Sequence, residues 1–563
     1  MNIKSAPTTY DAIVVGSGIS GGWAAKELCE MGLKTLVLER GRDVKHIADY
    51  TTALMNPWDF KYGLENTIDD QRNNPVQSTS YDAGDKHFFV RDQEHPYIQE
   101  TPFNWIRGYQ VGGRSLTWGR QCYRWSDLDF AANGKEGIGV DWPIRYRDLA
   151  PWYDYVEAFV GVSGQSEGLA QLPDGIFQPP MELNCIEQHL KAYIKKDDAR
   201  RVLTIARVAN LTKPVDGRGL CLNRNLCSRG CPYGGYFSSN SATLPAAAAT
   251  GNLTLHPHAI VMEILYDDAG SKATGVRVMD AVSMEVTEYY ARIIFLNAST
   301  IATAAILLNS KSGRFPDGLG NDSGELGRNL MDHHSYAGAY GVFGDKMLDK
   351  YYKGRRPSGF IIPRFRNLEQ NEGMGFLRGY GIQGHGERQE WGDRSNFLNG
   401  FGKSFKDQLT KPGPWTIWMA GWGECLPYPK NRVTLDVTER DKWGMPLVRI
   451  SFSYGENERV MMGDIEETTA EMLEKAGFED VYPFNYNKPG GSTIHEMGTA
   501  RMGADPETSV LNRFNQIHSV KNIFVTDGSC MTSSGSQNPS LTYMALTARA
   551  CHYAASEMKK GNL

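Results

Sequence analysis

The chain has 563 residues, of which 41% are hydrophobic and 22% are charged, and its formal net charge is −5. This length exceeds what a single hydrophobic core usually organises, so we expect two lobes. The chain has no basic tract, which excludes nucleic acid as an expected partner. Its nine cysteines are an odd number and most are scattered, which argues against a secreted disulfide framework.

Neither a membrane span nor an export signal is predicted. The most apolar long run, residues 293–308, is interrupted by asparagine, serine and threonine, and is typical of a core strand followed by a helix. The first eleven residues, MNIKSAPTTYD, contain no apolar signal core and no twin arginine. We therefore expect a protein that does not cross a membrane and carries no signal peptide of its own.

The N-terminal segment has the pattern of a dinucleotide-binding βαβ unit. An apolar strand at residues 12–15 runs into a G-x-G-x-x-G turn, Gly16-Ser17-Gly18-Ile19-Ser20-Gly21. Gly16 permits the tight turn, Gly18 lets the backbone approach a pyrophosphate, and Gly21 lets the following helix pack on the strand. The start of that helix, with Ile19 and Ser20, offers free N–H groups to an anion.

A second strand, at residues 35–38, ends at Glu39. A carboxylate in this place accepts hydrogen bonds from both hydroxyls of an adenosine ribose, and we include the neighbouring Arg40 in the same site. Since strand, glycines, helix, second strand and acid follow one another in the required order, the sequence predicts a bound dinucleotide. The motif by itself does not separate NAD from FAD.

A second glycine-rich stretch occupies residues 107–119. It follows an irregular, aromatic segment at residues 51–99, which we expect to run over the surface and to cover the cofactor. The paired Gly112 and Gly113, next to Arg114 and Ser115, can bring several backbone N–H groups onto phosphate or flavin oxygens, and we include Arg107 in the same site. An ordinary loop is the alternative for this stretch when it is considered alone.

Together, these stretches resemble the glucose-methanol-choline (GMC) family of flavoproteins, in its branch of bacterial sugar dehydrogenases and pyranose oxidases. The resemblance implies FAD and an α/β fold, in which a Rossmann-like FAD-binding lobe joins an α+β substrate lobe with a large antiparallel sheet. The discontinuous FAD-binding domain would comprise residues 1–50, 100–125, 216–334 and 485–563. The substrate-binding domain would comprise residues 126–215 and 335–484.

The mode of FAD attachment depends on one position. In several relatives a histidine in a G-G-x-x-x-H-W segment is covalently joined to the flavin. This sequence has Thr117 at that place, between Leu116 and Trp118. Non-covalent FAD is therefore expected.

Three cysteines lie within eleven residues, at Cys221, Cys227 and Cys231. Tight thiolate loops of this kind hold iron–sulfur clusters, and Arg224 and Arg229 can offset the charge. Zinc would require a fourth ligand, and a chance grouping in a buried loop is the remaining alternative. FAD sugar dehydrogenases whose catalytic subunit carries a [3Fe-4S] cluster have three cysteine ligands at a similar spacing. The resemblance therefore implies this cluster here, with these cysteines as ligands.

The C-terminal segment carries the predicted chemistry. His495 resembles the family's catalytic histidine in an H-x-x-G-T motif, and Asn538 occupies the second catalytic position, which is His or Asn in relatives. A neutral histidine can accept the proton of an alcohol, and the asparagine can hydrogen-bond the same oxygen.

The same segment supplies further expected FAD contacts. Asp527 and Gly528 resemble the pair that meets the ribityl and phosphate groups of FAD. Asn538, Pro539 and Thr542 lie where an apolar helix begins, and in the family this helix start faces the isoalloxazine ring. A helix N-terminus in that place stabilises the negative charge of reduced flavin.

Two adjacent histidines, His333 and His334, follow a segment that resembles the family's G-x-N-L-x-D-H sequence. They could serve as acid–base residues or as metal ligands. A structural role near the junction of the lobes is favoured, because no carboxylate–histidine spacing of a metal site surrounds them.

Periodicity predicts the remaining elements. Helices are expected at residues 147–162, 185–197 and 456–476, and strands at residues 254–256, 259–265, 274–279, 293–296 and 523–525. Residues 431–435 and 441–446 are expected to be strands of the large antiparallel sheet joined by a turn. The aromatic residues between 374 and 425 are typical either of sugar-binding faces or of a sheet core.

These assignments predict an FAD-dependent dehydrogenase that oxidises a secondary hydroxyl of a sugar or glycoside to a keto group, with a 3-keto product as the leading expectation. Hydride would pass to flavin N5, and electrons would leave through the [3Fe-4S] cluster to an external acceptor. The main alternative is a pyranose-oxidase-like enzyme that uses oxygen and lacks a cluster. A redox-inactive lyase and a non-catalytic electron-transfer subunit are further alternatives, and the His495 and Asn538 pair argues against the second.

The resemblance also implies partners. Relatives work with a small accessory subunit and often with a cytochrome or another electron acceptor, and that small subunit can carry the export signal for both. The expected location is therefore cytoplasmic, or periplasmic if the chain is exported together with a partner.

Overall fold

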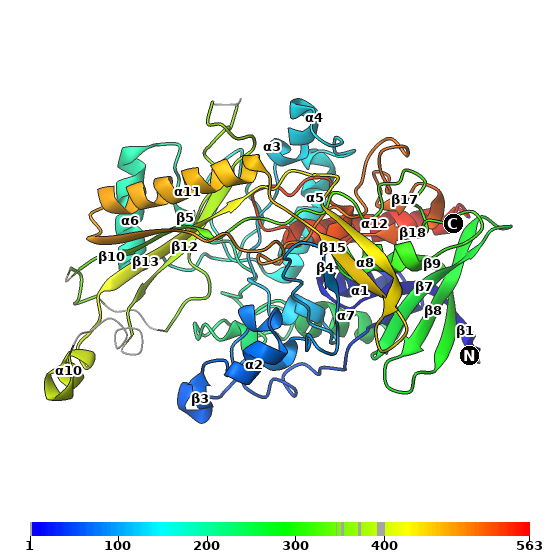
Figure 1. Ribbon diagram of the computed structural model, residues 1–563, viewed down its shortest axis with the longest axis horizontal. Coiled ribbons are helices and arrows are strands. Elements are labelled where there is room, and N and C mark those ends of the chain that lie inside the picture. The colour runs from blue at the N-terminus through cyan, green and yellow to red at the C-terminus, as the bar shows by residue number, and fades with distance from the viewer. Residues whose placement is uncertain (1–2, 345, 351–353, 370–372, 391–399) are drawn as a thin grey trace.

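The computed structural model describes residues 3–344, 346–350, 354–369, 373–390 and 400–563. Figure 1 shows two lobes side by side, with both marked chain ends in the lobe at the right. Each lobe is built on a sheet of its own, and a small third sheet accompanies them. The expected fold class, a Rossmann-like lobe joined to a lobe with a large antiparallel sheet, is confirmed. The residue boundaries between the two domains stay a prediction.

The sheet of the right-hand lobe has eight strands, in the order β17-β18-β9-β1-β2-β6, with β8 added beside β9 and β7 beside β8. The strands are β1 (Ile3–Val15), β2 (Thr35–Leu38), β6 (Leu253–His256), β7 (Ala259–Asp267), β8 (Lys272–Asp280), β9 (Val286–Leu296), β17 (Gln516–Ile517) and β18 (Val520–Val525). The five strands from β18 to β6 pair in parallel, whereas β17, β7 and β8 pair antiparallel. All five strands predicted in this sheet beyond the N-terminal unit are present, with β9 starting earlier than expected.

The carboxyl ends of four parallel strands are level with one another. Val15 pairs in register with Leu38 on one side and with Leu296 on the other, and Val525 also pairs with Leu296. The loops that follow therefore start at one edge of the sheet, at Gly16, Glu39, Asn297 and Thr526. In open α/β sheets this edge is where ligands bind.

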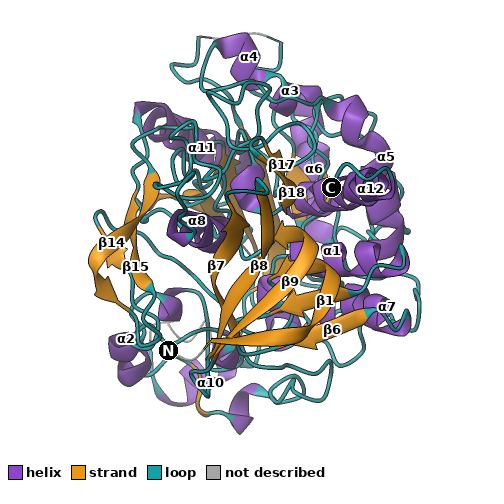
Figure 2. Ribbon diagram, turned by 90° about the vertical axis from the view of Figure 1, so that its right-hand side faces the viewer, coloured by secondary structure: helices purple, strands orange, loops and turns teal. Residues whose placement is uncertain are grey.

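Helices cover the sheet on both faces (Figure 2). They are α1 (Ile19–Glu30), α5 (Tyr146–Val160), α7 (Leu244–Ala249), α8 (Thr300–Asn309) and α12 (Ser540–Lys559). Helix α1 packs against both α12 and α7, and α8 packs against β7. Nearly every residue of α1 is buried, from Ser20 to Cys29, because neighbours surround it on all sides. This enclosure fixes the position of the glycine-rich turn from which α1 starts.

The sheet of the other lobe is antiparallel and has six strands, in the order β16-β10-β13-β12-β11-β5. The strands are β5 (Thr204–Ile205), β10 (Ala337–Val342), β11 (Phe360–Ile362), β12 (Tyr380–Arg388), β13 (Trp415–Gly423) and β16 (Asp480–Asn485). Helices α6 (Cys185–Asp197) and α11 (Glu456–Lys475) pack on it and share its hydrophobic core. Trp415 is buried in that core, whereas Trp418 is half-buried, as expected for side chains on opposite faces of one strand.

One prediction about this sheet is wrong. The structure has β14 (Arg432–Arg440) and β15 (Pro446–Ser451), so residues 441–445, expected in the second strand, form the turn between them. This strand pair belongs to a separate three-stranded sheet, in which β4 (Ile98–Gln99) pairs in parallel with β15. Trp443, at the turn, packs on β7, β8 and β9 through Ile260, Met279 and Val286. The hairpin pattern is local, but this tertiary contact anchors the hairpin to the first lobe.

The segment at residues 51–99 contains more regular structure than expected. It includes β3 (Lys61–Leu64) and a short helix, α2 (Ile68–Asn73), which Thr67 caps by accepting a hydrogen bond from the Asp70 N–H. A helix of six residues is too short to show an apolar period. The remaining short α-helices of the described residues are α3 (Asp127–Phe130), α4 (Ala132–Glu136) and α10 (Gly402–Leu409). In the described ranges, no helix combines the length and apolar character that a membrane crossing requires.

Candidate active site

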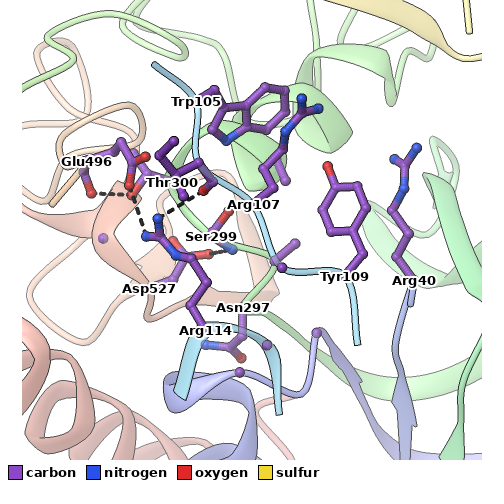
Figure 3. A pocket seen from close by; sticks show the side chains of 18 of the residues that line it. Arg40, Trp105, Arg107, Tyr109, Arg114, Asn297, Ser299, Thr300, Glu496 and Asp527 are labelled. Carbon is purple, nitrogen blue, oxygen red and sulfur yellow. Dashed lines mark hydrogen bonds and ion pairs between the residues drawn. The ribbon is translucent and has the colours of Figure 1, made fainter. Parts of the chain in front are cut away.

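A cavity of about 450 Å³ opens at the carboxyl edge of the parallel sheet. Its walls are the loops after β1, β2 and β9, part of the segment at residues 105–121, and the starts of α8 and α12. Figure 3 shows Arg114, Glu496 and Asp527 gathered on one side of the cavity, with Arg40 and Tyr109 on the other. The two glycine-rich stretches and the two predicted catalytic residues thus meet in one place.

Most of the predicted cofactor-binding residues line this cavity. They are Gly16, Gly18, Ile19, Ser20, Glu39, Arg40, Arg107, Gly113, Ser115, Asp527, Gly528, Asn538 and Pro539. Gly21, Gly112 and Thr542 do not line it. A Cβ at Gly21 would lie 1.9 Å from a carbonyl oxygen of the glycine-rich turn, so this residue allows close packing. Gly112 donates its N–H to Ser17 Oγ over 3.0 Å, and the Thr542 hydroxyl lies 2.8 Å from that of Tyr153.

Glu39 is held firmly at the end of β2. Its Oε2 accepts hydrogen bonds from the N–H and the hydroxyl of Ser17, at 3.1 Å and 2.6 Å, and its Oε1 accepts one from the Gly41 N–H at 2.9 Å. Burial raises the pKa of the Glu39 carboxyl group, and these hydrogen bonds oppose that rise. The side chain reaches the cavity wall, in the place of a ribose-binding acid.

Two arginines and several aromatic rings lie beside this end of the cavity. The Arg107 guanidinium lies 4.3 Å from the ring centre of Trp105, and that of Arg40 lies 4.8 Å from the ring centre of Tyr109 (Figure 3). The Nε and Nη2 of Arg107 are buried and have no hydrogen-bond partner among the described residues, although Asp92 lies 3.8 Å from Nη2. A buried cation with unused donors suits an anionic, oxygen-rich ligand.

The residues at the start of α1 fit the pyrophosphate of a dinucleotide. A Cβ at Gly18 would meet no atom within 4 Å, so the backbone is open there, and a Cβ at Gly113 would lie 3.2 Å from the Gly18 Cα. No side chain caps α1, which leaves its first N–H groups for a ligand. Asn297 Oδ1, Glu496 Oε1 and Tyr543 OH are buried at the cavity wall and lack hydrogen-bond partners in the described chain. These features together fit FAD.

The loop after β18 is fixed against α8. Asp527 Oδ2 accepts hydrogen bonds from the Ser299 N–H at 3.0 Å and from the Thr303 hydroxyl at 2.6 Å. Burial raises the pKa of this carboxyl group. A Cβ at Gly528 would come within 2.4 Å of the Glu496 carbonyl oxygen, so only glycine fits. The loop that bears these two predicted cofactor residues is therefore rigid.

His495 and Asn538 face each other at the cavity wall, with Nε2 of the histidine 3.5 Å from Nδ2 of the asparagine. Asn538 precedes α12, whose first residues line the cavity and which has no side-chain cap. His495 follows Ile494, a residue with φ of 64° whose carbonyl accepts a hydrogen bond from Arg114 at 3.1 Å. The pair combines a nitrogen base with an amide donor, which is what deprotonation of an alcohol requires.

Two buried residues hold this pair, and neither was predicted to do so. His333 Nδ1 lies 2.8 Å from His495 Nδ1, and Gln383 Nε2 donates to Asn538 Oδ1 over 2.6 Å. The sequence favoured a purely structural role for His333, and its immediate contact with His495 was missed. Its neighbour His334 has no hydrogen-bond partner at either ring nitrogen among the described residues. No sequence motif marks Gln383, which lies on β12 in the other lobe.

The surroundings keep His495 uncharged. Burial lowers its pKa well below 6.5, and the nearby His333 and Arg114 lower it further. The closest carboxylates are used elsewhere: Asp332 Oδ1 accepts the backbone N–H of His495 at 3.0 Å, and Glu496 Oε2 accepts from Arg114 at 3.2 Å. A neutral imidazole at neutral pH is the form that can accept a proton.

The three cysteines of the 221–231 loop lie close together. The Asn210 Nδ2 lies 3.9 Å from Cys221 Sγ and 3.8 Å from Cys227 Sγ, and Cys231 Sγ accepts the Gly235 N–H at 3.3 Å. None of them forms a disulfide. The loop lies against the glycine-rich stretch at residues 113–116, and Ser228 lines the cavity itself. The loop therefore lies between the cavity and the surface.

A single metal ion is not supported at this loop. In the part of the chain that the structure describes, no three His, Cys, Asp or Glu side chains gather around one metal position. In a three-iron cluster each thiolate binds a different iron atom, so its ligands do not converge on one point. The two arginines of the loop hold the segment at residues 53–55: Arg224 donates to the Ala53 carbonyl at 2.5 Å, and Arg229 to that of Met55 at 3.0 Å.

Comparison with known proteins agrees with this geometry. The 2-methyl-1,2-propanediol dehydrogenase of Mycolicibacterium austroafricanum is 29% identical over 96% of this chain and 94% of its own length. The fructose dehydrogenase large subunit of Gluconobacter japonicus is 24% identical over 98% of each chain. The crystal structure of a formate oxidase is similar in fold, with a TM-score of 0.63 and 15% identity over the whole of both chains.

The family itself is matched over most of the sequence. Residues 10–335 and residues 427–547 match the N-terminal and C-terminal parts of the GMC oxidoreductase family. These ranges include the glycine-rich turn, the cysteine loop, His495 and Asn538. The chain therefore belongs to the GMC oxidoreductase family, whose cofactor, FAD, fits the cavity at the edge of the parallel sheet.

Proposed function

We propose that this enzyme is an FAD-dependent dehydrogenase that oxidises a secondary hydroxyl of a sugar or glycoside to a keto group. The observation that carries the proposal is the His495 and Asn538 pair, a neutral base and an amide donor 3.5 Å apart on the wall of a cavity that fits FAD. Glu39, Arg107 and the two glycine-rich loops would hold the cofactor. Because Thr117 has no nucleophilic ring nitrogen, the flavin would be bound without a covalent link.

The chain's own residues would perform the proton chemistry. An alcohol C–H becomes a good hydride donor only when the oxygen loses its proton, and His495 Nε2, which faces Asn538, would accept that proton. Asn538 Nδ2 would donate a hydrogen bond to the same oxygen and orient the carbinol carbon. FAD, when bound, supplies the acceptor for the hydride. The unoccupied N–H groups at the start of α12 would stabilise the negative charge that then develops beside them.

The substrate class rests on relatives and on the family resemblance. A full-length relative is named for fructose, and another is named for a small diol. We assign the 3-keto product by resemblance to glucoside 3-dehydrogenases. A substrate panel should therefore combine hexoses, alkyl glucosides and a short diol, with the oxidised carbon of each product identified by NMR spectroscopy.

Cys221, Cys227 and Cys231 would hold a [3Fe-4S] cluster. Their mutual proximity and the position of Ser228 at the cavity wall support this part of the proposal. Bound there, the cluster would pass electrons singly toward the surface. Cys221 Sγ and Cys227 Sγ both lie within reach of the Asn210 amide, which could donate hydrogen bonds to the thiolate form.

An accessory subunit and a cytochrome or another one-electron acceptor are the proposed partners. The fructose dehydrogenase relative is itself a large subunit. Apolar side chains are unusually exposed beside the cysteine loop, with 54% of Leu222 and 42% each of Leu220 and Tyr233 accessible to solvent. Exposed apolar side chains of this kind favour a protein contact at the surface nearest the cluster. Co-export with such a subunit would place the enzyme in the periplasm.

Replacing His495 by alanine tests the role of the base. General base catalysis contributes about 10²–10⁴-fold, so the rate of flavin bleaching by substrate without oxygen should fall by that factor. FAD content should be unchanged, because the imidazole is not needed to hold the cofactor. A matched control is His518→Ala, which removes an imidazole outside the cavity. A full rate in His495→Ala would refute the proposed mechanism.

A second assay, carried out in air, separates the dehydrogenase from an oxygen-using oxidase. A dehydrogenase should reduce an artificial one-electron acceptor faster than it produces hydrogen peroxide in air. Peroxide formed in equal amount to the keto product, at the rate of dye reduction, would favour the pyranose-oxidase-like alternative.

A further inference from the structure

The ring of His333 is completely buried and touches His495 on one side and backbone carbonyl groups on the other. Its Nε2 lies 3.1 Å from the carbonyl oxygen of Ser534 and 2.9 Å from that of Gly535. A carbonyl oxygen can only accept a hydrogen bond. The proton of the neutral His333 ring is therefore on Nε2.

This assignment leaves His333 Nδ1 without a proton. Burial lowers the pKa of His333, and the backbone carbonyls only partly oppose this, so the ring is neutral and carries a single N–H. The other short contact of the ring joins its Nδ1 to Nδ1 of His495, over 2.8 Å. One of these two nitrogens must be the donor, and it can only be that of His495.

From this chain of contacts we infer that His333 is a positioning residue, which fixes His495 as the tautomer with a proton on Nδ1 and a bare Nε2 facing Asn538. The inference rests on the proposed function, in which His495 Nε2 accepts the proton of the alcohol. The other tautomer would carry hydrogen on Nε2, and it could then only donate toward the cavity. That form could not act as the base.

Neither of the two nearby carboxyl groups accepts the hydrogen bond from His495 Nδ1 in place of His333. A carboxylate usually orients a catalytic histidine. Here the nearby Asp332 accepts the backbone N–H of His495, and Glu496 pairs with Arg114. The orienting acceptor is thus an uncharged ring. It can fix the tautomer without the strong rise in basicity that a neighbouring carboxylate would cause.

The proton balance is simple. The alcohol O–H bond breaks, its proton forms a bond with His495 Nε2, and the electron pair stays on the substrate oxygen. The proton on His495 Nδ1 remains hydrogen-bonded to His333 Nδ1 throughout. The ring then carries one positive charge, and its release of the new proton restores the starting tautomer.

Two substitutions each keep one of the two kinds of contact that His333 makes and remove the other. In His333→Asn the amide oxygen takes the place of Nδ1 and can still accept from His495, while the contacts to the carbonyls are lost. In His333→Gln the amide N–H₂ reaches the place of Nε2 and keeps the carbonyl contacts, while the acceptor for His495 is lost. A matched control is His334→Gln, at a neighbouring buried histidine whose ring nitrogens have no hydrogen-bond partner among the described residues.

We expect His333→Gln to lower kcat by about 10²–10⁴-fold, the contribution of a general base, with little change in KM. His333→Asn and His334→Gln should retain most of the wild-type kcat. The inference is overturned if His333→Gln keeps its rate, or if His333→Asn loses as much as His333→Gln. The first result would mean that His495 needs no acceptor at Nδ1. The second would mean that the imidazole is needed for packing, and the thermal stability of each FAD-loaded variant identifies that case.

A spectroscopic measurement tests the tautomer directly. In holoenzyme with ¹⁵N-labelled histidines, the His495 Nε2 resonance should have the shift of an unprotonated nitrogen, and the His495→Ala spectrum identifies it by its absence. A protonated Nε2 in the wild-type enzyme would overturn the inference whatever the variants do. The two hypotheses fail separately: an active His495→Ala enzyme refutes the proposed base, whereas an inactive His495→Ala beside an active His333→Gln refutes only the positioning role.

Discussion

Asp332, the residue before His333, is completely buried and bonded to the backbone N–H of His495. Burial, and next the negative charge of Glu496, raise the pKa of its carboxyl group to about 7. In the unfolded chain an aspartate has a pKa of about 3.9. Between about pH 4 and about pH 7 the folded state therefore holds a proton that the unfolded state has released, and stability falls as the pH rises through this window.

Replacing Asp332 by asparagine should remove that dependence, because the amide does not titrate. Relative to wild type, Asp332→Asn should gain stability from about pH 5 to about pH 8, by about 1.4 kcal/mol for each pH unit between the lower pH and the native pKa of about 7. Urea unfolding curves of both proteins at the two pH values measure the difference. If the free energies of unfolding of the two proteins differ by the same amount at both pH values, Asp332 is ionised in the folded state at both.

At the residue scale, short motifs predicted His495 and Asn538, but not the residues that contact them. His495 and Asn538 stand in motifs with fixed spacing, so a single sequence could identify them. His333 was assigned a structural role and Gln383 was not singled out, because their function depends on which atoms they meet across the fold. Gln383 comes from β12, more than 150 residues before Asn538, and only the packing of the two lobes brings them together.

At the element scale, the glycines at the start of α1 have different tasks. A Cβ at Gly18 would meet no atom within 4 Å of the protein itself, whereas one at Gly21 would lie 1.9 Å from a backbone oxygen of the turn. We therefore propose that the space at Gly18 is for the ligand, whereas the space at Gly21 is taken up by the packing of α1 on the turn.

Alanine at each position should separate these two tasks. Gly18→Ala should fold with wild-type thermal stability in the absence of FAD, but bind FAD more weakly. Gly21→Ala should be less stable without FAD by about 1–3 kcal/mol, the usual cost of overpacking. FAD titration and thermal unfolding of the apoproteins measure both effects. Equal loss of stability in the two variants would contradict the assignment of Gly18 to the ligand.

Elements determined by local sequence patterns were predicted accurately, whereas the position of an element that depends on a tertiary contact was not. The strand at residues 35–38 and the helix at residues 185–197 agree with the structure at both ends, because apolar periodicity and local caps determine them. The hairpin β14–β15 was recognised as a hairpin but placed in the wrong sheet. Its position depends on the contact of Trp443 with the first lobe, and no local pattern encodes that contact.

At the scale of the whole molecule, the cysteine loop connects the cavity with the surface, where an external partner would accept electrons. Ser228 lines the cavity, while Leu222 and Tyr233 of the same loop are exposed, so the loop spans the distance from the site to the surface. If it holds the proposed cluster, substrate oxidation and the reduction of an external partner are separate events at its two ends.

Replacing Cys227 by serine should separate these events. The variant should keep its FAD and its bleaching by substrate, but lose the electron paramagnetic resonance signal of an oxidised [3Fe-4S] cluster and the reduction of a one-electron acceptor. Cys185→Ser, at a cysteine outside the loop, is the matched control. Iron, sulfide and FAD counted in the wild-type protein should give one cluster per FAD. Wild-type protein without iron would refute the cluster and favour the oxygen-using oxidase.

The order of strands in the parallel sheet has a consequence for the timing of synthesis. The last residues of β9 pair with β18, so that edge of the sheet stays bare until residues 523–525 have left the ribosome. At about 5–20 residues per second, a chain of 563 residues takes roughly half a minute to two minutes to make. While residues 297–525 are made, the nascent chain exposes the unpaired edge of β9, and until then it has no complete flavin pocket. Cofactor loading must therefore follow translation, and chaperones have a long interval in which to bind the growing chain.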